Sequence, residues 1–531
     1  MLFTSFQFIL FLAACLLLYY LLPKKCQWIL LLAASYVFYF MAGAVYPLFI
    51  FATALVTYTA AVVIENHKAR ENKYISEHSE EFAERETKKA YRKHGKHVRK
   101  WIMLAGLLSM LLLLGIFKYS DFVVENLNSL FALFGSEKEF DYPNLILPMG
   151  ISFYIFQSLG YLLDVYWEKI KAQRNFPKYM LFISFFPQLV QGPISRYSDL
   201  SKTLYQKHIF DKKNFTFGIW RILWGYFKKL VIADNLMVVT SYLFDDEYYN
   251  GAWVLLGMML WAVELYADFS GGIDITIGVA QLFGIRVQEN FIRPYFSKNI
   301  TEFWRRWHIS MGTWFRDYIF YPMSVSPSMA GFTKFYKNHL GKKAARYFPV
   351  WIVTIFTWLA TGIWHGASWN FVLWGLANGV IIVITTTMEP LYAKFHNRFP
   401  KLADSRCYDA FQIIRTFLLM SLLRMFDCYR DVSMCFSMFI SMFKNFDIHA
   451  LTKEEFSYFE LPFPMYGVLL AGTFVMFCVS LAGRSGSVCE KIAKKPFIVQ
   501  YVLFMGLFLS IVLFGAYGVG FDASQFIYNQ F

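Results

Sequence analysis

Apolar runs about as long as a membrane is thick recur along the whole chain, separated by short polar connections. A helix needs roughly 20 apolar residues to cross about 30 Å of hydrocarbon at about 1.5 Å per residue. The runs predict spans near residues 3–22, 27–44, 46–64, 101–117, 144–167, 215–242, 252–269, 349–366, 368–387, 410–427, 464–482 and 498–519. We expect an all-α polytopic membrane bundle of about 11–12 transmembrane helices.

In the middle of the chain, from about 176 to 345, the apolar runs are interrupted and do not resemble uninterrupted membrane spans. FFPQLVQGPISRY (185–197) and YADFSGGIDITIGVAQLFG (266–284) place Pro, paired Gly, Asp and Gln within apolar sequence. Broken backbone at membrane depth persists only where protein or a water-filled cavity satisfies its polar groups. We therefore expect the functional core here, built from short, re-entrant and interfacial helices.

The pattern predicts three parts. Residues 1–140 form N-terminal transmembrane helices with a charged cytoplasmic loop at 65–100. Residues 141–390 form the functional core, and residues 391–531 form C-terminal transmembrane helices that end in an extracellular aromatic tail.

Composition and charge agree with a membrane location. Hydrophobic residues make up 57% of the chain and charged residues 17%, against about 45–50% and about 25% in soluble domains. The net charge of +14 lies mostly in the connections, which favours positive-inside topology over nucleic-acid binding. The basic loop 65–100 is then cytoplasmic, and an even number of spans places both termini outside a plasma membrane. The simplest interpretation of residues 77–100, an acidic half followed by a basic half, is a solvated helical hairpin.

Of the ten histidines, only His308 and His365 lie in apolar aromatic sequence of the core. An ionisable group at membrane depth is a functional candidate. His365 ends an apolar run in WLATGIWHGASWNFVLWG (358–375), where Gly362 and Gly366 would let a backbone or a narrow channel approach closely. A desolvated, neutral imidazole there suits a general base. A structural histidine bonded to a carbonyl is the equal alternative from residue context.

His308 lies in NITEFWRRWHISMGTWFRDYIFYP (299–322). On a helix, Trp304, His308, Met311 and Phe315 would share one face, so His308 would point inward. The pattern alone favours a packed or supporting histidine on an interfacial helix.

Several polar side chains are candidates for binding the donor or substrate. Arg196, Arg293 and Arg305 could hold phosphates of a thioester donor, or anchor helices at the headgroups. Asp268, Asp274 and Glu289 could orient a histidine, but we expect them to pair with arginines, since buried carboxylates need partners. The seven cysteines show no metal-ligand spacing, so we expect no metal site and no bound cofactor.

The motifs at 185–197, 266–284, 289–322 and 358–379 together resemble the membrane-bound O-acyltransferase superfamily, in particular its bacterial branch for alginate O-acetylation and teichoic acid D-alanylation. The resemblance is dense from about Pro148 to Gly379. It implies that His365 of the WHG motif is the central catalytic residue and that His308 is the second. It also implies a central tunnel between a cytoplasmic thioester, expected to be acetyl-CoA, and an acceptor on the other side. Trp304, Trp364 and Asn370 are expected to contact the donor or substrate.

The chain ends in FDASQFIYNQF (521–531), similar to the aromatic terminus of alginate-type members. The resemblance implies that Tyr528 accepts the acyl group outside and that an extracellular serine-histidine (SGNH-type) transferase passes it to a polysaccharide. An aromatic membrane anchor is the alternative for this tail. We expect O-acetylation of a cell-envelope polysaccharide, with D-alanyl transfer to teichoic acid or proton-coupled transport as alternatives.

Overall fold

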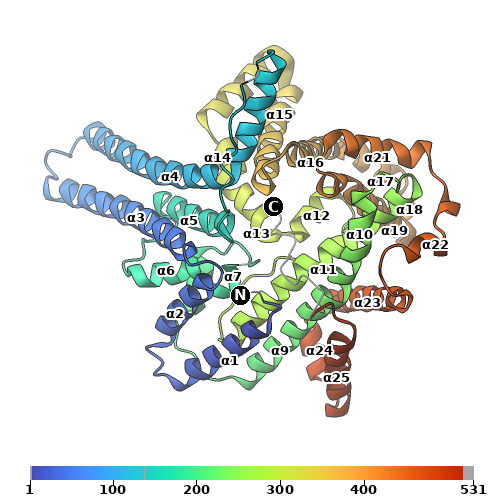
Figure 1. The fold of residues 1–531 in the computed structure, drawn as a ribbon. Helices are drawn as coiled ribbons and strands as arrows, with labels where there is room; N and C mark the ends of the chain where they lie inside the picture. The colour runs from blue at the N-terminus through green and yellow to red at the C-terminus, as the bar shows by residue number, and fades with distance from the viewer. Residues whose placement is uncertain (1–2, 137, 190, 518–531) are drawn as a thin grey trace. The chain divides into compact units, whose positions relative to one another are not determined.

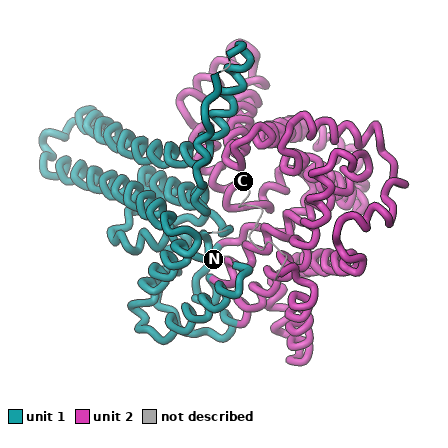
Figure 2. Tube along the Cα trace, in the orientation of Figure 1, with its two compact units in different colours: residues 1–215, 280–287 teal, residues 216–279, 288–531 magenta. Residues whose placement is uncertain are grey.

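The computed structural model describes residues 3–136, 138–189 and 191–517, whose regular elements are all helices, with no strand among these residues. Figure 1 shows the helices in chain order, and Figure 2 divides the chain into two compact units. Unit 1 holds residues 1–215 and 280–287, and unit 2 holds residues 216–279 and 288–531. The all-α prediction is confirmed, whereas the three-part division of the chain stays a prediction.

Unit 1 is built from the N-terminal helices. They are α1 (Phe6–Leu21), α2 (Gln27–Phe40), α3 (Tyr46–Glu77), α4 (Arg85–Leu133), α5 (Ile151–Tyr166), α6 (Phe176–Ser184), α7 (Phe186–Leu189) and α8 (Tyr197–Leu204). The helix α3 packs on both α4 and α5. The backbone from 191 to 196 is not helical, as the Pro and Gly of that stretch predict.

The chain enters unit 2 within α9 (Lys212–Tyr226). The π-helix η1 (Phe227–Ala233), α10 (Asp234–Asp245) and α11 (Ala252–Leu282) follow, and the last turn of α11 belongs to unit 1. Short elements follow: η2 (Pro294–Phe296), α12 (Ile300–Arg306), α13 (Ile309–Phe315), η3 (Arg316–Phe320) and α14 (Tyr321–Ser324). These short elements match the irregular middle predicted from the sequence.

Longer helices complete unit 2. They are α15 (Pro327–His365), α16 (Trp369–Thr387), α17 (Glu389–Arg398), α18 (Pro400–Ala403), α19 (Arg406–Leu423), α20 (Met425–Cys428), α21 (Val432–Lys444), η4 (Ile448–Ala450), α22 (Lys453–Ser457), α23 (Phe463–Ala482), η5 (Gly483–Ser485), α24 (Val488–Ala493) and α25 (Phe497–Phe514). The helix α15 is kinked at Gly341, whose φ is 84°. Its second half packs along α16.

The stretch 266–284 differs from its prediction. We expected its paired glycines to break the backbone, but α11 is one continuous helix through them. The small residues instead let α9 and α11 approach: a Cβ built on Gly225 would lie 2.6 Å from the carbonyl oxygen of Gly271, and one built on Gly278 would lie 2.8 Å from that of Gly218. Close packing of helix backbones is a common use of small residues in membrane proteins.

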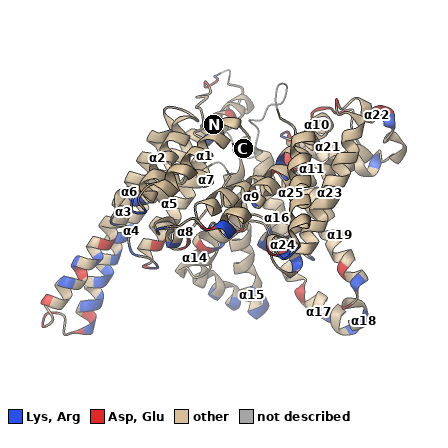
Figure 3. Cartoon of the chain, turned by 90° about the horizontal axis from the view of Figure 1, so that it is seen from below, with Lys and Arg blue, Asp and Glu red and all other residues tan. Residues whose placement is uncertain are grey.

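Seven helices among the described residues are long and apolar enough to cross a membrane: α3, α4, α11, α15, α16, α23 and α25. The shorter apolar helices α1, α2 and α21 also occur. Every predicted span contains a helix, and the chain is a multi-pass membrane protein. The count of twelve spans stays a prediction. Figure 3 shows that charged side chains gather toward the free ends of α3 and α4 in unit 1 and around α17 and α18 in unit 2.

Candidate active site

His308 lies at a break between two short helices, α12 and α13. Its backbone is left-handed, with φ 46° and ψ 53°, which is uncommon for a residue with a side chain. The single helix that we predicted through this segment is therefore wrong. Asn290 holds the break, because its carbonyl accepts the Ile309 N–H at 3.0 Å and its Oδ1 accepts the Ser310 N–H at 2.9 Å.

The same asparagine sets the tautomer of His308. Both side-chain atoms of Asn290 lie near Nδ1 of His308, with Nδ2 at 3.1 Å and Oδ1 at 3.4 Å. Because Oδ1 accepts the Ser310 N–H and Nδ2 makes the shorter contact, we assign Nδ2 as the donor to Nδ1. A neutral imidazole that accepts at Nδ1 carries its proton on Nε2. His308 is thus prepared to donate a hydrogen bond through Nε2.

The imidazole of His308 is fully buried, as the sequence predicts. Phe269 of α11 meets it edge-on at 4.8 Å between ring centroids. Burial lowers the pKa of His308 to about 3, because the charged form would lose its hydration. The ring is neutral at physiological pH.

His365 ends α15, and the turn to α16 begins at Gly366. Gly362 lets the two helices approach, since a Cβ there would lie 2.4 Å from the carbonyl oxygen of Phe371. A Cβ on Gly366 would overlap the Phe371 ring at 2.0 Å. The imidazole is half-buried and meets Trp374 of α16 at 4.7 Å between centroids. Close packing of α15 on α16 therefore fixes the position of the turn that carries His365.

One indole contacts both histidines. The centroid of the Trp364 ring lies 6.2 Å from the centroid of the His308 ring and 5.2 Å from that of the His365 ring. Unit 2 thus brings together two residues that are 57 positions apart (365 − 308) in the sequence. Trp304 lies in the same aromatic cluster, 5.5 Å from the Trp374 ring, and donates from Nε1 to Asn378 at 3.1 Å.

Asn370, another predicted contact residue, is buried at the start of α16. It hydrogen-bonds to Ser368 and donates from Nδ2 to the Phe426 carbonyl at 2.7 Å. It therefore ties the turn after His365 to α20.

The three predicted arginines lie in different surroundings. Arg293 has a left-handed backbone, and its guanidinium lies 5.7 Å from the centroid of the Phe296 ring. Arg305 is exposed. Arg196 belongs to unit 1, before α8. Their proposed contacts with a donor stay predictions.

Asp268, Asp274 and Glu289 are paired, as expected, but with cations that the sequence analysis did not single out. Asp268 pairs with Lys229 at 2.5 Å, and Asp274 pairs with Lys228 at 2.6 Å. Arg221 pairs with Asp274 at 2.9 Å and with Glu289 at 2.5 Å. Lys228 and Lys229 are adjacent in otherwise apolar sequence, and this pair could have predicted the ion pairs, because buried cations require nearby anions.

Arg424 is a further buried cation that sequence reasoning missed. Its exposed fraction is 4%, and its guanidinium lies 4.2 Å from the ring centroid of Trp307, the neighbour of His308. Its ion pair with Asp427 is long, at 3.6 Å. Within the described part of the chain, its Nε and Nη2 have no hydrogen-bond partner. A buried guanidinium with unused donors is suited to bind an oxygen of a ligand.

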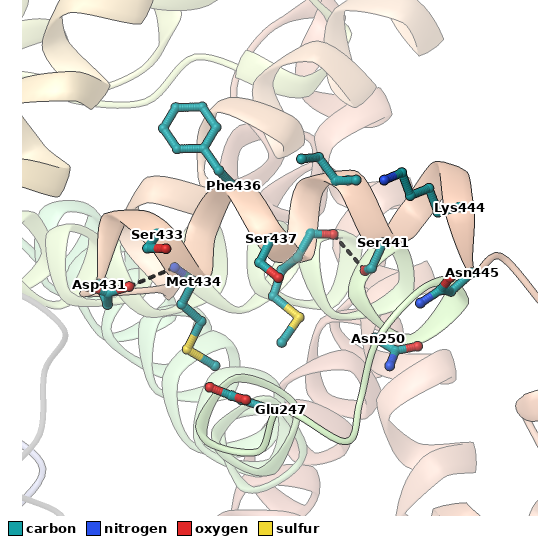
Figure 4. A pocket seen from close by; sticks show the side chains of 12 residues that line it. Glu247, Asn250, Asp431, Ser433, Met434, Phe436, Ser437, Ser441, Lys444 and Asn445 are labelled. Atoms are coloured by element: carbon teal, nitrogen blue, oxygen red, sulfur yellow. Dashed lines mark hydrogen bonds between the residues drawn. The ribbon is translucent and has the colours of Figure 1, made fainter.

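A separate polar pocket of about 770 Å³ lies between α21 and the connection from α10 to α11. Figure 4 shows Glu247 and Asn250 of that connection opposite Ser437 and Ser441 of α21. The Gly251 N–H donates to Ser441 Oγ at 2.9 Å and joins the two elements. Neither histidine of the candidate site lines this pocket.

Comparison with known proteins identifies the family. Residues 168–429 match the membrane-bound O-acyltransferase (MBOAT) family. The chain is 36% identical to the probable alginate O-acetylase AlgI of Azotobacter vinelandii, over 73% of this chain and 69% of that protein. It is 32% identical to a peptidoglycan O-acetyltransferase of Helicobacter pylori, over 57% and 58% of the two chains. It is 28% identical to a teichoic acid D-alanyltransferase of Bacillus subtilis, over 52% and 67%. The chain therefore belongs to the membrane-bound O-acyltransferase family, and it is an O-acyltransferase.

Proposed function

We propose that this chain transfers an acetyl group from cytoplasmic acetyl-CoA to a hydroxyl acceptor, for O-acetylation of an alginate-type cell-envelope polysaccharide. Trp364 in contact with both His308 and His365 is the observation that carries the proposal, because it gathers a base and a hydrogen-bond donor in one site. The similarity to alginate O-acetylases of Azotobacter and Pseudomonas, at 34–38% identity, supports the acetyl group and the polysaccharide.

In this proposal His365 is the general base. Its neutral imidazole removes the proton of the acceptor hydroxyl while the hydroxyl oxygen attacks the thioester carbonyl carbon. The C–S bond then breaks, and the thiolate of the donor takes the proton from the His365 imidazolium. The products are an acetyl ester and a free thiol, so protons and charges balance.

His308 and Arg424 stabilise the negative charge that develops on the carbonyl oxygen. The tautomer held by Asn290 gives His308 a donor at Nε2, and the unused N–H groups of Arg424 offer further donors beside Trp307. Such preorganised donors cost no rearrangement during the reaction. Trp304, Trp364 and Asn370 would shape the donor site, and Arg196, Arg293 and Arg305 are proposed to hold its phosphates.

The acetyl group then passes to Tyr528 and onward to an SGNH-type extracellular transferase. Tyr528 lies outside the described residues, so this step is proposed from the similarity of residues 521–531 to the tail of alginate-type members. It requires the C-terminus outside the plasma membrane, and therefore an even number of spans with the N-terminus outside.

Replacement of His365 by Ala tests the central step. Removal of a general base costs about 10²–10⁴ in rate, so envelope polysaccharide from cells with this variant should lack acetyl esters. His339→Ala is the matched control, because His339 is exposed on the same helix. Acetylation at the wild-type level by a folded His365→Ala variant would refute the role. Mass analysis of the C-terminal peptide separates acetyl from D-alanyl transfer by the mass of the adduct on Tyr528.

A further inference from the structure

A basic pocket of about 480 Å³ lies on unit 1, whereas the histidine site belongs to unit 2. Five cationic or ionisable side chains of α4 line it together with one aromatic residue from the end of α5: Lys93, His94, Lys96, His97, Lys100 and Tyr166. The lysines and histidines are exposed. No Asp or Glu lines this pocket.

The pocket occupies one face of α4. Lys93, His97 and Lys100 follow each other at i, i+4 and i+7, which places them along one side of the helix. Another face carries Gly95 and Arg99 and packs against α3, where buried Arg99 pairs with buried Glu71. The arginine that faces protein is thus neutralised, whereas the cations on the pocket face are not.

The three lysines of the pocket lack anions of their own. Lys68 pairs with Glu168 and Lys73 pairs with Glu77 on the neighbouring α3, but Lys93, Lys96 and Lys100 form no ion pair with any residue in 3–136, 138–189 or 191–517. Three ammonium groups on one face repel each other, and a bound anion relieves that repulsion.

The position of the pocket along α4 indicates a membrane surface. The apolar part of α4 begins at Trp101, which is 59% exposed and of a type that favours the membrane interface. Trp101 Nε1 donates to His97 Nε2 at 2.8 Å, so neutral His97 keeps its proton on Nδ1 as a donor. Lys93 lies about 10 Å along the helix from Lys100, and one headgroup layer is about 5–8 Å deep, so Lys96 and Lys100 lie within a headgroup layer of the apolar part and Lys93 lies just beyond it.

The order of charges along the hairpin of α3 and α4 is the order expected beside an anionic membrane surface. Glutamates lie toward its free end, at positions 77, 80, 81, 84 and 86, and the lysines of the pocket lie next to the apolar part of α4. Figure 3 shows both signs of charge on this part of α3 and α4. An anionic membrane surface attracts the basic half and repels the acidic half.

We propose that this pocket binds the phosphate headgroup of an anionic phospholipid of the cytoplasmic leaflet. The lysines supply the charge, and the histidines and Tyr166 supply hydrogen-bond donors. A lipid fits better than a soluble phosphate compound, because the adjoining Trp101 and the apolar helix offer a surface for its acyl chains. This inference does not depend on the acetyl-transfer function.

Native mass spectrometry of the full chain in detergent, with equal phosphatidylglycerol and phosphatidylcholine, tests the proposal. Each lysine near an anionic surface contributes about fivefold in binding, so K93Q/K96Q/K100Q should lose on the order of a hundredfold of the preference for phosphatidylglycerol. K93R/K96R/K100R keeps the charges and should retain the preference. If the triple Gln variant does not fold, K96Q alone should show about a fivefold loss.

A matched control removes the same number of charges from α4 outside the pocket. R85Q/K88Q/R92Q should bind phosphatidylglycerol like the wild type, since none of these residues lines the pocket. Equal losses in the two Gln triples, or no preference for phosphatidylglycerol in the wild type, would overturn the proposal. Displacement of the lipid by millimolar inorganic phosphate or adenosine 3′,5′-bisphosphate would overturn it too, and assign the pocket to a soluble phosphate ligand.

Discussion

Replacement of Asn290 by Asp changes one hydrogen-bonding atom beside His308 and, when the side chain is ionised, adds a negative charge at a fully buried position. One carboxylate oxygen can still accept the Ser310 N–H, which keeps the start of α13. The other oxygen replaces the amide NH₂ that lies 3.1 Å from Nδ1 of His308, and it can only accept. The imidazole must then present a proton at Nδ1.

Two magnitudes decide how His308 responds. A neighbouring carboxylate raises a histidine pKa by about 1–3 units, and burial holds the pKa of His308 at about 3. The pKa in the variant would therefore reach only about 4 to 6, and the ring would stay mostly neutral at about pH 7.5. A neutral ring with its proton on Nδ1 has none on Nε2. The donor proposed for the reacting oxygen is lost, which costs about 10²–10³ in kcat.

The assay is the rate of thiol release from acetyl-CoA by the purified chain with an acceptor, measured from about pH 4 to 8. The ratio of variant to wild-type kcat should rise as the pH falls through about 6 to 4, because protonation restores the Nε2–H of His308. The thermal midpoint in detergent should fall, since a carboxylate at this fully buried position is desolvated, although the cap on Ser310 remains. A wild-type kcat for the Asn290→Asp variant at about pH 7.5 would refute the tautomer argument.

Three further changes test separate parts of the structure. Arg424→Met should lower kcat at least about tenfold, and it should also lower thermal stability, because it leaves the largely buried carboxylate of Asp427 without its cation; unchanged kcat in the folded variant would exclude a role for the guanidinium. Gly225→Val should destabilise unit 2 by about 1–3 kcal/mol in a detergent melting assay. Gly467→Ala is the control and should melt like the wild type, because a Cβ at Gly467 meets nothing within 4 Å. Equal melting of both variants would contradict the close approach of α9 and α11. Tyr528→Phe should abolish the acetyl adduct on the C-terminal peptide, and an adduct elsewhere on that peptide would argue against the relay.

Local sequence was sufficient to predict where helices form in the apolar runs. Each predicted apolar run contains a helix, from α1 at Phe6–Leu21 to α25 at Phe497–Phe514, because transfer of a segment into lipid depends on the residues of that segment. The burial of His308 was also predicted, although the single helix on which that prediction rested is broken at His308. The shape of its backbone was not predicted.

Distant contacts decided the rest. The break at His308 depends on Asn290, 18 positions earlier (308 − 290), and α11 stays continuous through its glycines because α9 packs on them. The sequence alone predicted that Asp268 would be paired but not that Lys229 would be its partner. Nor could it distinguish Arg424, buried over Trp307 with unused donors, from arginines that lie at the surface. Burial removes water as the alternative partner, so the chemistry of each buried polar group is decided by the residues that folding brings beside it.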